Sequence, residues 1–241
     1  MCYIVAVQIW FDREATDMTQ RNSTVKSILL NALISAVSLF VNGFGIYLTI
    51  LAGIGAAPWD VFSLGLSKTL GILYGNASVT VSFLILAVDV LMKEPIGIAM
   101  FIDAVVVGKA VDFFNYLALF SQPRTMIGSV IMMIIGLFIL GYTCFTYMWA
   151  SLGCGPRDTL LVGLAKRLKR IPIGAISIMI LSMVTLVGYL LGGPVGIGTL
   201  ICAFCTGPIM QFAFRTVHFD ATAIHHQSLR EFADVILGKN G

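Results

Sequence analysis

Six apolar runs, each long enough to cross a lipid bilayer, constrain the fold of this chain more than any other feature. About 20 helical residues, at 1.5 Å of rise each, cover the roughly 30 Å of hydrocarbon in a bilayer. Inside lipid, backbone polar groups must be bonded within the segment, which helices achieve. The pattern predicts an all-α membrane protein, a polytopic bundle of six to eight helices. The runs are residues 27–54, 76–92, 96–119, 126–152, 174–192 and 195–214.

The composition agrees with a lipid-facing exterior and excludes several other classes. Of the 241 residues, 58% are hydrophobic and only 11% are charged, against about 25% charged in a soluble domain. The net charge of +3 is scattered between apolar runs, so no nucleic-acid partner is expected. Cys202 and Cys205 lie inside an apolar run, where packing is favoured over redox chemistry. We expect no cofactor, no metal site and no enzymatic activity.

Two shorter apolar segments, residues 58–73 and 156–165, each begin at or just after a proline. The second would form only about 15 Å of helix, which is too short to cross a bilayer alone. We predict a broken or re-entrant element, since such elements are tolerated when they are buried in protein.

The chain contains an internal repeat that includes both short segments. Six residues recur 98 positions later, and three more recur 99 positions later. The repeat predicts tandem units at 25–120 and 121–216, each with a proline-interrupted short helix, between tails at 1–24 and 217–241. Met18 is an alternative start within the first tail. Paired repeats with interrupted segments are typical of secondary transporters. The pairs are Gly55/Gly153, Pro58/Pro156, Asp60/Asp158, Gly65/Gly163, Leu66/Leu164, Lys68/Lys166, Pro95/Pro194, Gly97/Gly196 and Gly108/Gly207.

These segments also carry a family resemblance. The combination GIGAAPWDVFSLGLS, LGCGPRDTLLVGL, GGPVGIGT and GPIMQ resembles the bacterial YczE/YyaS/YitT family of membrane proteins, closest to its YczE branch. The resemblance covers about residues 27–215. It implies a multi-pass inner-membrane protein of bacteria and supplies no settled activity, catalytic residue or cofactor.

Two topologies fit the basic residues, which collect on the cytoplasmic side of short loops. With the basic loop 166–170 inside, eight crossings and parallel repeats leave twelve basic residues inside and one, Lys93, outside. Six crossings and inverted repeats give eleven inside and two, Lys68 and Arg124, outside. The count slightly favours eight crossings, whereas the shortness of 156–165 favours six. Both models place both termini in the cytoplasm.

Four residues at the proline breaks are candidates for a ligand site or pathway. Asp60 and Asp158 each lie two residues after a proline, where a carboxylate meets free N–H groups and the positive end of the helix dipole. They either only start two helices or bring two helix starts together at one site. Trp59 corresponds to Arg157, so such a site would be asymmetric. Arg157 could pair with Asp158, snorkel to the interface, or bind an anionic solute.

The run 96–119 carries charges inside a predicted span. Lys109 and Asp112 are three residues apart, a spacing that predicts a structural pair. Asp103 faces the other side of the helix without a local partner, so it is a candidate functional residue. Asp89 lies near the end of its run, close to Lys93, and is predicted to be interfacial.

Two functions remain open from the sequence. The repeats and intramembrane charges favour a transporter-like protein, a permease for an unidentified small solute. The alternative is a non-transporting accessory or regulatory protein that binds a membrane partner or lipid. The sequence leaves the oligomeric state open.

Overall fold

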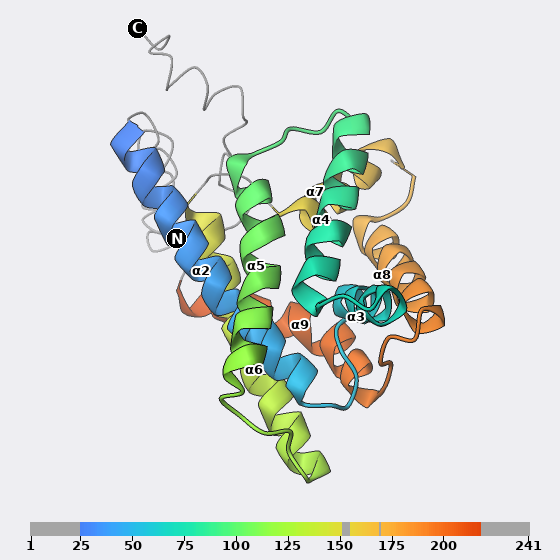
Figure 1. The fold of residues 1–241 in the computed structure, drawn as a ribbon. Helices are drawn as coiled ribbons and strands as arrows, with labels where there is room; N and C mark the ends of the chain where they lie inside the picture. The colour runs from blue at the N-terminus through green and yellow to red at the C-terminus, as the bar shows by residue number, and fades with distance from the viewer. Residues whose placement is uncertain (1–24, 151–154, 169, 218–241) are drawn as a thin grey trace, which may run out of the picture.

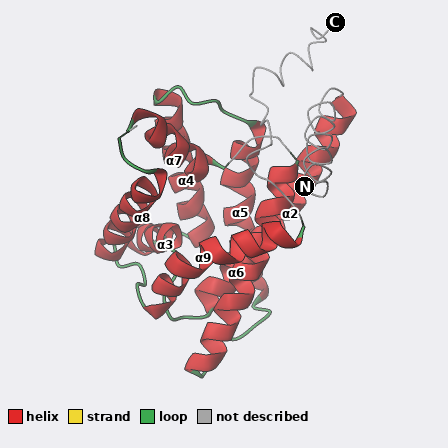
Figure 2. Ribbon diagram, turned by 180° about the vertical axis from the view of Figure 1, so that it is seen from behind, coloured by secondary structure: helices red, strands yellow, loops and turns green. Residues whose placement is uncertain are grey.

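The computed structural model describes residues 25–150, 155–168 and 170–217, and this part of the chain forms eight helices and no strand (Figures 1 and 2). The predicted tails, apart from Val217, and the possible start at Met18 lie outside the described residues. The predicted all-α architecture is confirmed. The helices are α2 (Val25–Leu51), α3 (Pro58–Leu70), α4 (Tyr74–Leu91), α5 (Ile98–Leu117), α6 (Met126–Trp149), α7 (Pro156–Arg167), α8 (Ile173–Leu190) and α9 (Ile197–Thr216).

The long helices coincide with the apolar runs, and the two short helices coincide with the proline breaks. Helices α2, α4, α6, α8 and α9 are long and apolar enough to cross a membrane. Helix α5 has 20 residues and therefore similar length, although it carries three charged residues. Helices α3 and α7 have 13 and 12 residues, about 20 Å each, so neither can cross the hydrocarbon alone.

Helices α2 and α6 cross at the centre of the bundle and run in opposite directions. The Asn42 side chain donates a hydrogen bond of 2.9 Å to Thr143, and Gly45 lies against Gly136, which also meets Thr49. Residue numbers thus rise along α2 as they fall along α6.

Each of these central helices has a parallel neighbour from its own half of the chain. Phe40 and Phe44 of α2 pack on Phe114 of α5, while Met133 and Tyr142 of α6 contact Cys202 and Thr216 of α9. Helices α5 and α9 therefore run antiparallel to each other, as α2 and α6 do.

The short helices pack across the boundary between the halves. Helix α3 packs on α8, where Gly65 and Gly188 allow close approach, and α7 packs on α4. The two halves share element order and similar helix lengths. Superposition of 27–119 on 126–215 remains a prediction from the sequence.

An ion-pair cluster joins the end of α7 to the loop between α4 and α5. Glu94 accepts hydrogen bonds from Lys166 Nζ at 2.7 Å and Arg167 Nη1 at 2.8 Å. Arg167 also donates to the carbonyl groups of Met92 and Gly163. Eight crossings would place Glu94 and Lys166 on opposite sides of the membrane. The contact therefore favours the alternative of six crossings, in which α3 and α7 do not cross.

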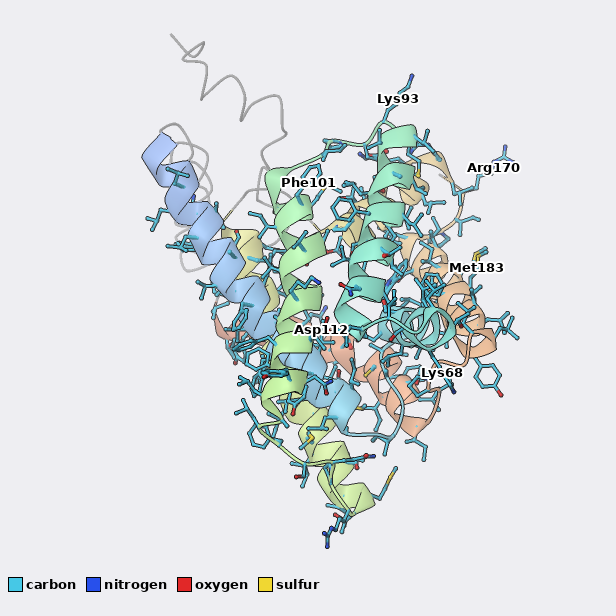
Figure 3. All side chains as sticks on the ribbon, viewed as in Figure 1. Lys68, Lys93, Phe101, Asp112, Arg170 and Met183 are labelled. Carbon is cyan, nitrogen blue, oxygen red and sulfur yellow. The ribbon has the colours of Figure 1, made fainter. Side chains whose placement is uncertain are left out.

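The end of α3 makes the corresponding contact with the segment after α8, where Thr69 Oγ1 donates to the Leu191 carbonyl at 3.1 Å. Lys93 and Arg170 lie at one end of the bundle, and Lys68 lies nearer to mid-height (Figure 3).

This geometry predicts which positions are labelled together. In a chain whose native cysteines are replaced, single cysteines at Lys93 and Arg170 should react with an impermeant reagent from one side of the membrane. Cysteines at Lys68 and Arg124 should react from the other. Because basic residues gather at the face of Lys93, we expect that face to be cytoplasmic. Labelling of positions 93 and 68 from the same side would contradict six crossings.

The Glu94 cluster predicts a pH-dependent contribution to stability. Hydrogen bonds from Lys166 and Arg167 hold the pKa of Glu94 below its ordinary value of 4.5. A carboxylate with a lowered folded-state pKa contributes stability above its unfolded pKa, and that contribution is lost as pH falls through the folded value. Glu94→Gln should therefore reduce stability by about 1 kcal/mol at pH 7, because both cations are half-exposed.

Thermal unfolding in detergent measures this effect. The difference between Glu94→Gln and the parent chain should shrink below about pH 4. Arg170→Gln, in the same loop, should unfold like the parent at both pH values. A difference that is constant from neutral to acid pH would show that the charge of Glu94 is not responsible.

Candidate functional site

A cavity of about 560 Å³ lies between the two halves and contains all five candidate residues of the sequence in its wall. Trp59 and Asp60 come from α3, Asp103 from α5, and Arg157 and Asp158 from α7. Apolar and small residues complete the wall: Leu39, Asn42, Ile46, Ala57, Ser78, Ser82, Val107, Leu137, Leu140, Gly141, Cys144, Tyr147, Met148, Gly155, Leu161, Val162, Thr206, Met210 and Phe214.

Each short helix begins at a proline, and its first residues line this cavity. Pro58 and Pro156 occupy the first turns of α3 and α7, after the extended residues Ala57 and Gly155. Proline suits this position because its missing N–H would have no helical partner. The aspartates do start the helices, as one interpretation held, and they also line one cavity, as the other held.

Two tyrosines bind the two helix-starting carboxylates. Tyr74 donates to Asp60 Oδ1 at 2.8 Å, and Asp60 is only 3% exposed. Tyr147 donates to Asp158 Oδ2 at 3.3 Å, and Asp158 is accessible from the cavity that it lines. Neither tyrosine was identified from the sequence, because each lies on another helix and no spacing links it to its aspartate.

Arg157 lies over the ring of Trp59, with its guanidinium carbon 5.4 Å from the ring centroid. This distance permits a cation–π contact. Within the described residues, Arg157 forms no ion pair with Asp158, so this one of the three alternatives for Arg157 is not observed. Trp59 and Arg157, which occupy corresponding positions in the two repeats, therefore contact each other.

Asp103 enters the cavity from the second turn of α5. A Cβ atom at Gly155 would lie 3.2 Å from Asp103 Oδ2 and 3.7 Å from Asp158 Oδ2. The missing side chain of Gly155 thus leaves room between two carboxylates. No hydrogen bond to Asp103 occurs within the described part of the chain.

Lys109 and Asp112 do not form the direct pair that their spacing predicts. Lys109 Nζ instead donates to Asn76 Oδ1 at 2.6 Å, and Asp112 Oδ1 accepts from the Gly75 N–H at 2.8 Å. The first N–H groups of a helix lack intrahelical partners, and α4 has no side-chain cap of its own. Asp112 therefore caps α4 from α5, and contact between helices replaces the local pair.

Asp89 is completely buried within the protein, and its position relative to the membrane interface stays a prediction. Neither of its carboxylate oxygens has a hydrogen-bond partner. The end of α4 is covered by α7, a contact that hydropathy along the sequence could not indicate. Asp89 does not line the cavity.

The fold and the cavity define the class: a multi-pass helical membrane protein with an internal polar site. Residues 29–215 match a family described as "Family of unknown function (DUF6198)", and the chain belongs to that family. This result agrees with the resemblance to YczE and YyaS.

Three curated relatives are similar over most of their length. The "Uncharacterized membrane protein YczE" of Bacillus subtilis is 30% identical over 73% of this chain and 81% of its own length. An "Uncharacterized protein" of Haemophilus influenzae is 29% identical, over 76% and 82%. "Uncharacterized protein YyaS" of Bacillus subtilis is 25% identical, over 75% and 90%. No solved structure matches the chain.

The two tyrosine–aspartate contacts predict unequal effects on stability. Tyr74→Phe leaves the buried Asp60 carboxylate without its donor, so it should lower the free energy of unfolding by about 1–3 kcal/mol. Tyr147→Phe is the matched control, since water in the cavity can replace its longer bond to Asp158. Thermal unfolding of both variants in detergent measures the difference. Equal losses would contradict the different burial of the two aspartates.

Proposed function

We propose that the protein is a transporter-like permease of the inner membrane, which binds a small solute in the cavity between its halves. The observation that carries the proposal is the meeting of the α3 and α7 starts at one cavity. Transporters with inverted repeats place their solute sites at such interrupted helices, near the bilayer midplane.

The paths of the short helices support this proposal. Helix α3 begins at the cavity and ends where Thr69 contacts Leu191, and α7 begins at the cavity and ends at the Glu94 cluster. In the proposed mechanism, each of these helices borders one path to the cavity. Tilting of the halves against each other would open one path while it closes the other.

The size and lining of the cavity also suit a small solute. Ligand pockets commonly have volumes of about 300–1,000 Å³, with mainly apolar walls and a few polar groups. This cavity has a similar volume, an apolar wall, and the charged groups of Asp103, Arg157 and Asp158. Ionisable residues inside a membrane domain commonly mark solute or ion pathways. The proposal includes no chemical reaction.

A cavity block tests the proposal. Val162 lines the cavity and is 44% exposed, so a bulky maleimide on Val162→Cys, in a chain without native cysteines, should fill the site. Compounds from a panel of amines, amino acids, carboxylates and sugars are tested for thermal stabilisation and for uptake into protein-containing vesicles. We expect at least one compound to do both before modification and neither afterwards.

The control is the same reagent on Arg170→Cys, which is exposed and outside the cavity. Its modification should change neither stabilisation nor uptake. A compound that stabilises the protein but never enters vesicles would favour a non-transporting accessory protein. The absence of both effects across the panel would contradict solute binding.

A further inference from the structure

The charges that line the cavity are unequal in sign. Three carboxylates, Asp60, Asp103 and Asp158, face one guanidinium, Arg157, and none of the described residues in the wall is a lysine or a histidine. Arg157 interacts electrostatically with all three carboxylates, yet it forms no ion pair with any of them within the described residues. One guanidinium cannot balance three carboxylates.

Two of the three carboxylates have local compensation. Asp60 and Asp158 lie in the first turns of α3 and α7, where each helix dipole supplies roughly half a positive charge. Each also accepts a hydrogen bond from a tyrosine. The two helix starts and Arg157 together therefore offset about two negative charges.

Asp103 lacks this compensation. It lies in the second turn of α5, beyond the N-cap Gly97 and the first turn, and it accepts no hydrogen bond from the described residues. Arg157 attracts its carboxylate, and Asp158 repels it. One uncompensated carboxylate therefore remains beside the space left by Gly155.

We infer that the solute of this cavity carries a protonated amine and that Asp103 binds it. The inference rests on the proposed function and adds the chemical class of the solute. An amine beside Asp103 offsets the remaining negative charge, whereas an anion would add to it. The apolar wall formed by Leu39, Ile46 and Val107 suits an amine with a hydrocarbon part.

A bare metal ion fits the cavity less well than an organic amine. Metal ions such as Ca²⁺ need six to eight oxygen ligands around one point. No three histidine, cysteine, aspartate or glutamate side chains of the described residues converge on such a point. Arg157 remains available for an acceptor elsewhere on the solute, such as a hydroxyl, a carbonyl or a carboxylate.

The first experiment measures the charge preference of the cavity without any solute. Val162→Cys, in a chain without native cysteines, reacts with a cationic and an anionic methanethiosulfonate, and each rate is normalised to that of a free thiol. We expect the cationic reagent to be favoured by at least about fivefold, since one charge at this range changes local concentration by that order. Asp103→Asn should reduce the preference, and Asp103→Glu should keep it.

The second experiment uses three probes with one carbon skeleton: butylamine, 4-aminobutyrate and butyrate. Stabilisation by butylamine or 4-aminobutyrate, lost in Asp103→Asn and retained in Asp103→Glu, supports the inference. Stabilisation by 4-aminobutyrate alone shows that the solute also carries a carboxylate. Stabilisation by butyrate alone indicates an anion site at Arg157 and overturns the inference. If no probe binds, the ratio of the two reagent rates in the first experiment tests the inference.

Three results of the reagent experiment also overturn the inference. These are equal rates for the two reagents, a preference for the anionic reagent, and a cationic preference that is unchanged in Asp103→Asn. These outcomes are separable from a failure of the proposed function. If a compound is taken up but the reagents show an anionic preference, the permease proposal stands and the amine inference fails. If the cationic preference depends on Asp103 but no compound is taken up, the cation site stands and the transport proposal fails.

Discussion

The arrangement of this protein depends on two helices that are too short to cross a bilayer. Helices α3 and α7 leave polar backbone groups at both ends, and such groups are tolerated at membrane depth only where protein or a water-filled cavity surrounds them. Each short helix therefore packs against a long helix of the other half, α3 on α8 and α7 on α4. This exchange interlocks the halves and brings both helix starts to the space between them.

Several polar side chains inside the bundle find their partners on other helices, because lipid offers them none. Asp112 caps α4 from α5, Asn42 bonds Thr143 across the central crossing, and Tyr74 bonds Asp60. These contacts fix the relative register of neighbouring helices. Asp89 is the contrast: its buried carboxylate has no hydrogen-bond partner, and nothing in the surrounding structure explains why it is present.

The sequence was sufficient for the helices because their signals are local. Apolar length located the spans, and a proline with a following aspartate located the starts of α3 and α7. The five candidate residues came from two local signals, the proline breaks and an isolated charge within a span. Their meeting at one cavity required the tertiary fold.

What the sequence missed depends on contacts between distant segments. Tyr74 and Tyr147 have no spacing that links them to their aspartates. Lys109 was expected to pair with Asp112, but it donates a hydrogen bond to Asn76 instead. The choice between six and eight crossings depends on such contacts too. Counting basic residues treats each loop separately, whereas the contact between Glu94 and Lys166 places two loops on one side.

The crossing of α2 and α6 has a mechanical consequence. Gly45 and Gly136 meet there so closely that a Cβ atom on either would lie within 3.0 Å of the other's carbonyl oxygen. The side chains of Leu140, Ile139 and Thr49 surround the two glycines. A larger residue at either glycine would push the two backbones apart and stretch the nearby hydrogen bond between Asn42 and Thr143. The two glycines therefore set the spacing between the halves of the chain.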